Sequence, residues 1–185
     1  MEDKDSRLDE ISQLVKERFN EADVKVHGFT WFFGEHVSVV EDLALDLCDK
    51  YGADKEVVRA AALLHDVGLI GEGPEGHEER SADGCKKILA DHNFSKEFRE
   101  KVSDVILDNG DTLEGRVLET ADALSHFKSA HFFVKAATED TYEDFKAWAI
   151  EKIEYDLNRI HFEEESEEAQ KLADLFLERL TYTDQ

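Results

Sequence analysis

Hydrophobic residues recur at every third or fourth position along most of the chain, which is the spacing of one buried face of an α-helix. The clearest runs lie in segments 5–20 and 34–51. The first run consists of Leu8, Ile11, Leu14, Val15 and Phe19, and the second of Val37, Val40, Leu43, Ala44, Leu47 and Tyr51. No stretch alternates between polar and hydrophobic residues as an exposed strand does. The pattern therefore predicts an all-α protein.

The starts of further helices are marked by capping residues. Asp54, Ser95 and Thr112 each precede a periodic run, where a side-chain oxygen can accept a hydrogen bond from a free backbone N–H. Glycines cluster in the loop 67–76, and Asn109–Gly110 is a turn signal. The helices that we expect beyond the first two cover 54–65, 77–90, 95–106, 112–124, 140–162 and 164–181.

A chain of 185 residues has the size of one ordinary domain and can bury a hydrophobic core without disulfides. We expect a single helical bundle over residues 1–185. Its centre is expected at about 31–126, with the helices of 140–181 packed on it.

The excess of acidic residues limits the kinds of molecule that we expect the protein to bind. Lysine and arginine total 22 against 45 aspartates and glutamates, giving a net charge of −23. Nucleic-acid polymers and anionic membranes both favour basic surfaces, so we expect neither as a partner. A small phosphorylated substrate would need a local cation, and a metal ion is one source of it. The sequence leaves a homodimer open.

The N-terminal residues and the cysteines indicate the cellular compartment that we expect for the protein. The first residues, MEDKDSRLDE, lack the apolar stretch of a signal peptide, and no run of 18 apolar residues could span a membrane. Cys48 and Cys85 form no C-x-x-C pair and are interpreted as core residues of a reduced, cytoplasmic protein.

Four residues that bind metals well stand at positions expected to face the core. His36 and Asp122 each lie on the hydrophobic face of a predicted helix. His65 and Asp66 end a third helix, where a carboxylate meets the negative end of the helix dipole at a cost of roughly 0.3–1 kcal/mol. One divalent cation would stabilise all four side chains.

Two imidazoles and two carboxylates suit Mn, Fe, Co, Ni or Zn better than Ca, with Mg as an alternative. Each residue also has a plainer interpretation when taken singly. A core histidine is usually hydrogen bonded, and a buried aspartate is usually a cap or an ion-pair partner. Their joint order on separate helices favours one metal ion bound inside a bundle.

Three blocks in this order, EHVSVV, AALLHDVG and ETADALSH, resemble the HD superfamily of metal-dependent phosphohydrolases, whose pattern is H…HD…D. The resemblance runs from about Trp31 to His126 and implies an all-α fold. The metal ligands that it implies are His36, His65, Asp66 and Asp122.

A further segment, GHEERSADGCKKIL, is similar to the family's H-E-x-x-x-A segment and places His77 beside the metal. In binuclear members this histidine helps to hold a second metal, together with a histidine pair before the last aspartate. Here Asp108 and Asn109 stand in that region, and Leu69 replaces a lysine often found three residues after the HD aspartate. These departures favour a single metal ion.

The chemistry implied by the resemblance is hydrolysis of a phosphoester. Asp66 would ligate the metal and orient a water molecule, and His77 would position the phosphate or give a proton to the leaving oxygen. Arg80, three residues after His77, would clamp the phosphate. A surface ion pair with a neighbouring acidic residue is an equally good interpretation of Arg80.

Three functions are compatible with this pattern. The first is a hydrolase of a small phosphate ester, for which a nucleotide is a candidate, and the retained ligands favour it. The second is a non-catalytic metal-binding module for regulation or assembly. The third is an oxygenase with a di-iron site, which the missing histidine pair argues against. The histidines given no role are His27, His92, His126, His131 and His161.

Overall fold

The structure is a computed structural model that describes residues 4–108 and 110–181. These residues form helices joined by short loops, without a strand among them, and this confirms the predicted all-α fold. The helices are α1 (Lys4–His27), α2 (Ser38–Tyr51), α3 (Lys55–Leu64), α4 (His77–Asp91), α5 (Lys96–Ile106), α6 (Leu113–Lys128), α7 (His131–Thr138), α8 (Tyr142–Leu157) and α9 (Glu163–Thr181), with a π-helical turn η1 (Phe33–Val37) and a 3-10 turn η2 (Val67–Leu69).

The three predicted N-caps are confirmed. The side chains of Asp54, Ser95 and Thr112 each accept a hydrogen bond from the backbone N–H three residues later, at 3.3, 3.2 and 3.0 Å. Each bond satisfies one of the backbone donors left free in the first turn of a helix. These side chains therefore fix the starts of α3, α5 and α6.

Three helices differ from the sequence-based expectation at their ends. α6 continues to Lys128 instead of ending at Leu124. α1 continues to His27 instead of ending near residue 20, although Val24 and Val26 near its end are exposed. α8 ends at Leu157, and residues 158–162 form the loop to α9. Helix ends are the least reliable part of a periodicity argument, because the last turn often carries no buried residue.

Helix α7 is not predicted by the sequence pattern. It has eight residues, so it completes only about two turns and offers too few positions for a helical period to stand out. Of the predicted Asn109–Gly110 turn, Asn109 lies outside the described residues, and Gly110 has a φ of 80°.

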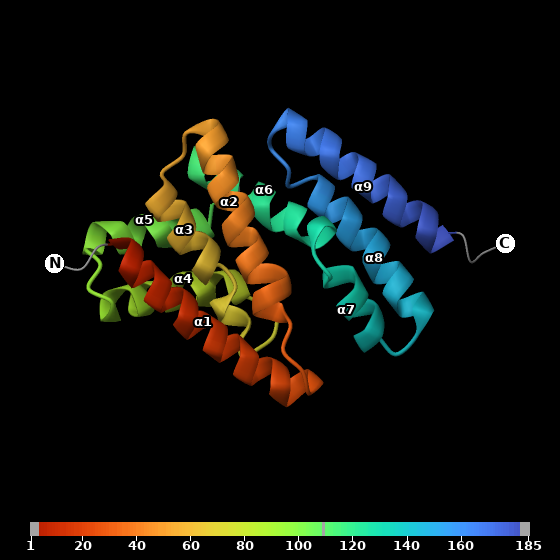
Figure 1. Ribbon diagram of the computed structural model, residues 1–185, viewed down its shortest axis with the longest axis horizontal. Coiled ribbons are helices and arrows are strands. Elements are labelled where there is room, and N and C mark those ends of the chain that lie inside the picture. Colours follow the sequence, from red (N-terminus) through yellow and green to blue (C-terminus); the bar gives the residue numbers. More distant parts are fainter. Residues whose placement is uncertain (1–3, 109, 182–185) are drawn as a thin grey trace.

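The helices fall into two groups (Figure 1). In this view α1 to α5 form one end of the molecule, and α7, α8 and α9 form the other, with α8 and α9 side by side. One cluster of buried hydrophobic side chains lies among the helices up to α6, and a second lies among α6 to α9. α6 contributes Leu118 to the first cluster and Leu124 and Phe127 to the second. Asp122 lies on α6 between these residues, at the junction of the two clusters.

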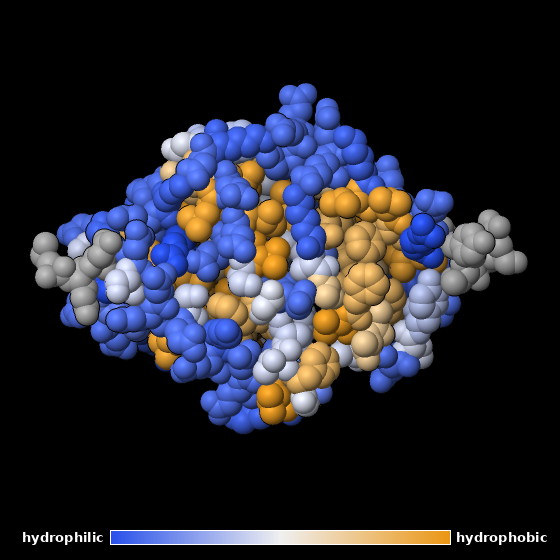
Figure 2. All heavy atoms as spheres, in the orientation of Figure 1, coloured by the Kyte–Doolittle hydropathy of each residue, from blue (hydrophilic) through white to orange (hydrophobic). Residues whose placement is uncertain are grey.

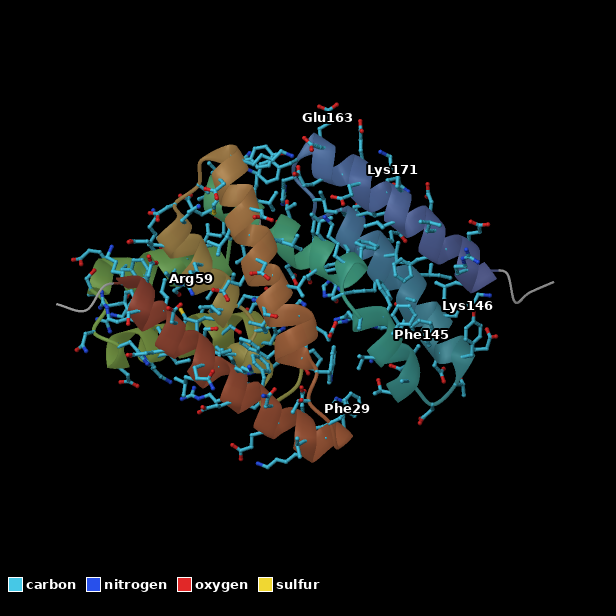
Figure 3. All side chains as sticks on the ribbon, viewed as in Figure 1. Phe29, Arg59, Phe145, Lys146, Glu163 and Lys171 are labelled. Carbon is cyan, nitrogen blue, oxygen red and sulfur yellow. The ribbon has the colours of Figure 1, made fainter. Side chains whose placement is uncertain are left out.

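Hydrophilic residues cover much of the face seen in Figure 2. Several charged side chains link neighbouring helices. Arg59 on α3, labelled in Figure 3, donates hydrogen bonds to Glu41 on α2 at 2.7 Å and to Asp9 on α1 at 2.5 Å. None of the helices in the described part of the chain is both long and apolar enough to cross a bilayer.

Candidate metal centre

His36 reaches the centre of the molecule from the π-helical turn η1. The backbone N–H of Ser38 donates to the carbonyl of Phe33, five residues earlier, and this wide turn changes the direction of the side chains around it. The buried carboxylate of Asp23 accepts bonds from the N–H groups of Trp31 and Phe32 at 2.7 and 2.8 Å. Asp23 thereby fixes the segment that leads into the turn, and His36 is only 2% exposed.

The other three predicted ligands come from two further helices. His65 and Asp66 follow the last residue of α3, and Asp66 is buried. Asp122 projects from α6, with its side chain 13% exposed. The sequence-based expectation placed these four residues together, and the structure brings them together.

Their ligand atoms form a compact group around one point. The Nε2 atom of His36 lies 3.2 Å from Nε2 of His65, 3.1 Å from Oδ2 of Asp66 and 3.4 Å from Oδ1 of Asp122. The Nε2 atom of His65 lies 3.4 Å from the same Asp66 oxygen and 3.8 Å from the same Asp122 oxygen. The two imidazole nitrogens thus each lie within 3.8 Å of an oxygen of Asp66 and of an oxygen of Asp122.

This spacing fits a bound transition-metal ion. With metal–ligand bonds of about 2.1 Å, neighbouring ligand atoms of an octahedral or tetrahedral ion lie roughly 3.0–3.4 Å apart. The observed separations of 3.1 to 3.8 Å match or slightly exceed this range. The mixed nitrogen and oxygen donors are also the set that Mn, Fe, Co, Ni or Zn accepts.

Hydrogen bonds orient the imidazoles so that each presents Nε2 to the centre. The Nδ1 atom of His36 lies 3.0 Å from the hydroxyl of Ser125, which itself donates to the backbone carbonyl of Asp122 at 2.7 Å. That hydroxyl is therefore the acceptor for Nδ1–H of His36. The Nδ1–H of His65 donates to the carbonyl of Ala62 at 2.8 Å. Both histidines thus keep a lone pair on Nε2, as metal ligation requires.

The electrostatics of the cluster also favour a cation. Burial raises the pKa of Asp66, but the nearby imidazoles of His65, His36 and His77 outweigh this and hold its pKa well below the usual range. Burial also raises the pKa of Asp122. Arg159 and the surrounding histidines outweigh this effect, so the pKa of Asp122 lies well below its usual value. Both carboxylates are therefore ionised at neutral pH.

His77 lies beside this cluster, at the start of α4. Its Nε2 atom is 3.4 Å from Oδ1 of Asp66, and its Nδ1–H donates to the carbonyl of Pro74 at 2.8 Å. The hydrogen bond with Asp66 is the main cause that raises the pKa of His77 to about 8. The structure therefore places a cationic donor next to Asp66, on the oxygen that does not face the other ligands.

Arg80 is placed differently from the sequence-based expectation. Its guanidinium donates to the carbonyls of Gly68, Gly73 and Glu75 at 3.0, 2.5 and 2.5 Å, so it organises the loop 67–76. It does not line the cavity described below. The simpler expectation of a surface ion pair also describes it incompletely, because its main partners are backbone oxygens. Its separation from Glu72 is 3.4 Å.

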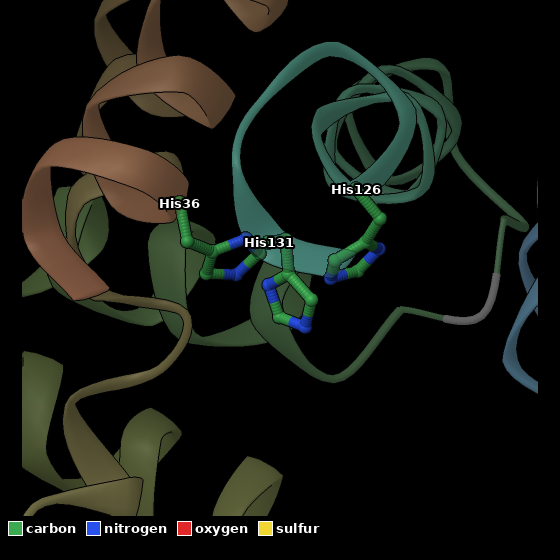
Figure 4. Close-up of side chains that lie close together, drawn as sticks. All are labelled: His36, His126 and His131. Carbon is green, nitrogen blue, oxygen red and sulfur yellow. The ribbon is translucent and has the colours of Figure 1, made fainter. Parts of the chain in front are cut away.

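Two histidines that the sequence reading left without a role lie next to His36. His126 on α6 and His131 on α7 lie close to His36 (Figure 4). The rings of His36 and His126 stack with centroids 5.0 Å apart, and those of His126 and His131 meet edge to face at 4.5 Å. The signal that could have indicated His126 is its spacing of four residues from Asp122 on one helix.

Burial keeps these two histidines neutral. It lowers the pKa of His126, despite the carboxylate of Asp156 3.1 Å from Nδ1, and it lowers the pKa of His131 to about 2. Ligand atoms of His36, His126 and His131 lie within 4.8 Å of one another. This trio uses only imidazoles and shares His36 with the group of His36, His65 and Asp66, which includes a carboxylate.

Arg159, which follows α8, contacts the predicted metal ligand Asp122. Its Nη1 donates to Oδ2 of Asp122 at 2.6 Å, and its Nε lies 3.4 Å from Oε1 of Glu119. The bond occupies the Asp122 oxygen that faces away from His36 and leaves Oδ1 turned to the centre. Sequence periodicity gave no signal for Arg159, because it lies 37 residues from Asp122.

The cluster opens into a cavity of about 500 Å³. Its walls are contributed by the loop 67–76, by α6, by α7 and by α8. Beside the metal-ligand candidates and His77, the lining includes two lysines and one arginine, Lys135, Lys152 and Arg159. A cavity of this size is typical of sites for small organic ligands.

The chain matches the family model of the HD domain over residues 33–177. It belongs to the HD domain family. The match extends well past the segment from Trp31 to His126 that carries the sequence resemblance, and it includes α7, α8 and most of α9. The family is one of hydrolases of the phosphohydrolase type. A search of curated proteins finds no match.

Solved structures share the fold at low identity. Bacillus subtilis YpgQ in complex with ADP is 21% identical with a TM-score of 0.71, and the alignment covers 98% of this chain and 95% of that chain. An HD-superfamily hydrolase from Bacillus thuringiensis is 18% identical with a TM-score of 0.68, covering 97% of each chain. At these identities the likeness shows the fold alone.

Proposed function

We propose that the protein is a metal-dependent phosphohydrolase that acts on a small phosphate ester, with a nucleotide as the leading candidate. The observation that carries the proposal is the convergence of His36, His65, Asp66 and Asp122 on one centre at the wall of a cavity. These residues would hold one divalent transition-metal ion. Such an ion supplies Lewis acidity towards a phosphoryl oxygen and increases the acidity of a water molecule.

Side chains of the site would position the water and the phosphate and transfer the proton. Asp66 would orient the attacking water by accepting a hydrogen bond from it through the oxygen nearest His77. His77, protonated at neutral pH, would hold a phosphate oxygen or give its proton to the leaving oxygen. Arg159 and Lys152, which line the cavity, would bind the phosphate in place of Arg80, which does not.

Two arguments support a small substrate. The net charge of −23 repels a nucleic-acid polymer over a Debye length of about 10 Å at 0.1 M salt. A small ester has only to enter the cavity, where cationic side chains are present. A nucleotide is supported by the aromatic lining of the cavity and by the similarity in fold to a protein that binds ADP.

The alternative is a metal-binding module without turnover. It is favoured by one departure from the family pattern, the carboxylate of Asp108 in the cavity lining where a histidine of binuclear members is expected. A protein with this feature would bind the metal but lack part of the catalytic apparatus.

The test is a panel of phosphate esters assayed with the manganese-loaded protein. We expect turnover of at least one mononucleotide or similar small ester, and neither binding nor cleavage of a single-stranded oligonucleotide. The variant Asp122→Ala is the control for contaminating phosphatases and should be inactive. Faster cleavage of the oligonucleotide would contradict the small-substrate proposal, and a fully loaded protein without any turnover would establish the non-catalytic alternative.

A further inference from the structure

His126 lies one helical turn after Asp122 on α6, so the two side chains project from the same face of the helix. The Nε2 atom of His126 is 3.9 Å from Oδ1 of Asp122, the oxygen that also faces His36. The imidazole of His126 is buried, with its side chain only 5% exposed. Two metal-binding side chains at this spacing on one helix can bind the same ion, as the two histidines of an H-E-x-x-H helix do.

The placement of His126 relative to Asp122 matches that of the predicted ligand His65. The Nε2 atom of His65 lies 3.8 Å from the same Asp122 oxygen, against 3.9 Å for His126. The ring of His36 lies 5.2 Å from the ring of His65 and 5.0 Å from the ring of His126, measured between centroids. With bonds of about 2.1 Å, ligand atoms of one octahedral ion lie roughly 3.0 Å apart when adjacent and 4.2 Å apart when opposite. Both Nε2 atoms are therefore within reach of an ion that Asp122 binds.

The carboxylate of Asp156 determines which nitrogen of His126 carries the proton. Nδ1 of His126 lies 3.1 Å from Oδ2 of Asp156, and the two atoms are buried and otherwise unpaired among the described residues. Lys152 donates to the other oxygen of Asp156 at 2.6 Å and holds the carboxylate in place. An acceptor beside Nδ1 keeps the proton on that atom and leaves a lone pair on Nε2. A carboxylate behind the imidazole in this way is the usual support of a histidine that binds a metal.

Three imidazole nitrogens thus surround one carboxylate oxygen. Oδ1 of Asp122 lies 3.4 Å from Nε2 of His36, 3.8 Å from Nε2 of His65 and 3.9 Å from Nε2 of His126. All three rings have an acceptor at Nδ1, so their Nε2 lone pairs face the ionised oxygen without a proton between them. Such an arrangement is repulsive in a buried site, and a cation between these atoms removes the repulsion. His126 takes part in this arrangement to the same extent as His65.

We infer that His126 is a fifth protein ligand of the metal ion, in addition to the four predicted ones, and that Asp156 is its positioning residue. The inference rests on the metal centre of the proposed function, although not on turnover. A third imidazole makes the donor set richer in nitrogen. Imidazole suits Fe, Co, Ni and Zn, whereas oxygen donors suit Mn and Mg, so His126 shifts the preference of the site towards the first group.

The test counts the imidazoles on the ion by proton NMR of the cobalt-loaded protein. Paramagnetic Co(II) moves the Nδ1–H signal of each imidazole bound through Nε2 far outside the ordinary range, and exchange into D2O removes this signal. We expect one such signal from each of His36, His65 and His126. The four predicted ligands alone would give only two signals, because two of them are aspartates.

Two substitutions of His126 separate metal binding from packing. In His126→Asn the amide nitrogen takes the place of Nδ1 and can still donate to Asp156, but no atom replaces Nε2. In His126→Gln the amide oxygen takes the place of Nε2 and the donor to Asp156 is lost. Either variant should lose the third signal, so one that folds is sufficient. The matched control is His131→Asn, which removes another buried imidazole, 4.5 Å from that of His126 between centroids, and should keep all three signals.

Metal affinities, measured by competition with a chelator, give a second readout. His126→Asn should weaken Co(II) binding by about a hundredfold and Mn(II) binding by only about tenfold, because the lost imidazole contributes more to the cobalt complex. His126→Gln should fall between His126→Asn and the unaltered protein, since it keeps an oxygen donor. A merely structural role of His126 would weaken both ions by the same factor.

Three results would overturn the inference: two signals in the unaltered protein, loss of a signal in His131→Asn in place of His126→Asn, or an equal loss of affinity for both ions in His126→Asn. The proposed function fails separately. Three signals without turnover of any ester would refute the phosphohydrolase and leave the fifth ligand standing. Turnover by a protein with two signals would refute the fifth ligand alone.

Discussion

At the scale of single residues, each metal-ligand candidate is oriented by a second group. Ser125 turns Nε2 of His36 to the centre, the carbonyl of Ala62 does the same for His65, and Arg159 occupies the outer oxygen of Asp122. Side chains held in this way do not have to be reordered when an ion binds, which favours affinity. The geometry of the site thus depends on residues that do not themselves contact the ion.

We expect Asp122→Ala to abolish metal binding, because it removes one ligand and frees Arg159 beside the remaining ones. Metal at a hundred times its dissociation constant should stabilise the unaltered protein by about 2.7 kcal/mol and leave the variant unaffected. Elemental analysis and the melting temperature with and without metal measure both effects. Asp104→Ala, an exposed substitution on α5, should behave like the unaltered protein. Metal content unchanged by Asp122→Ala would contradict the ligand assignment.

His77→Ala is expected to retain the metal and to lower kcat by about a hundredfold or more, the usual contribution of a general acid. His77 contacts only the Asp66 oxygen that faces away from the other ligands, so its loss should leave the four ligand atoms in place. His92→Ala, at the other end of the same helix and outside the cavity, is the matched control. Two ions per chain in the unaltered protein and one in His77→Ala would instead make His77 a ligand of a second metal.

At the scale of elements, the site depends on how helices approach one another. α6 joins the two hydrophobic clusters and carries Asp122 where they meet. α4 lies against the turn η2 so closely that Gly68 has no room for a side chain. A β-carbon there would lie 2.3 Å from the carbonyl oxygen of His77 and 2.7 Å from the backbone nitrogen of Ser81. The position of His77 is thereby tied to that of Asp66.

Gly68→Ala should therefore displace α4 and destabilise the protein by about 1–3 kcal/mol, as overpacking against backbone does. In a chain of 185 residues this lowers the melting temperature by about 2–4 °C per kcal/mol. Activity should fall as well, because His77 moves with the start of α4. Gly34→Ala is the matched control, since nothing lies within 4 Å of a β-carbon there. Equal stability of the two variants would show that η2 and α4 are not held in contact.

At the scale of the whole molecule, the two buried cysteines report on global opening. Burial raises the pKa of Cys48 and of Cys85 to about 12, so each thiol is protonated and shielded in the folded state. They lie in different helices of the larger hydrophobic cluster. Reaction with a thiol reagent therefore requires unfolding of that cluster.

We expect neither thiol to react with a thiol reagent at pH 8 in the folded protein, and both to react in urea. Metal that binds only the folded state should slow the labelling in proportion to one plus the ratio of its free concentration to its dissociation constant. In Asp122→Ala the labelling should be faster and independent of metal. Rapid labelling of either cysteine without urea would show that the larger cluster opens locally.

The sequence by itself determined the helical class, three helix starts and the residues most suited to hold a metal. These are local properties. Hydrophobic periodicity depends on neighbours within a few turns, a cap depends on the next three residues, and the metal affinity of histidine or aspartate depends on its own chemistry. The spacing of His36, His65, Asp66 and Asp122 on buried faces therefore carried most of the information about the ligands.

Only the tertiary structure decided which other side chains share the site. His131 lies on a helix too short to show a period, and Arg159 meets Asp122 across 37 residues of chain. Arg80, which had the right spacing from His77, is engaged by the carbonyls of its own loop instead. The physical reason is that the position of a helix along and around its neighbour is set by packing between distant segments, and a local pattern holds no information about it.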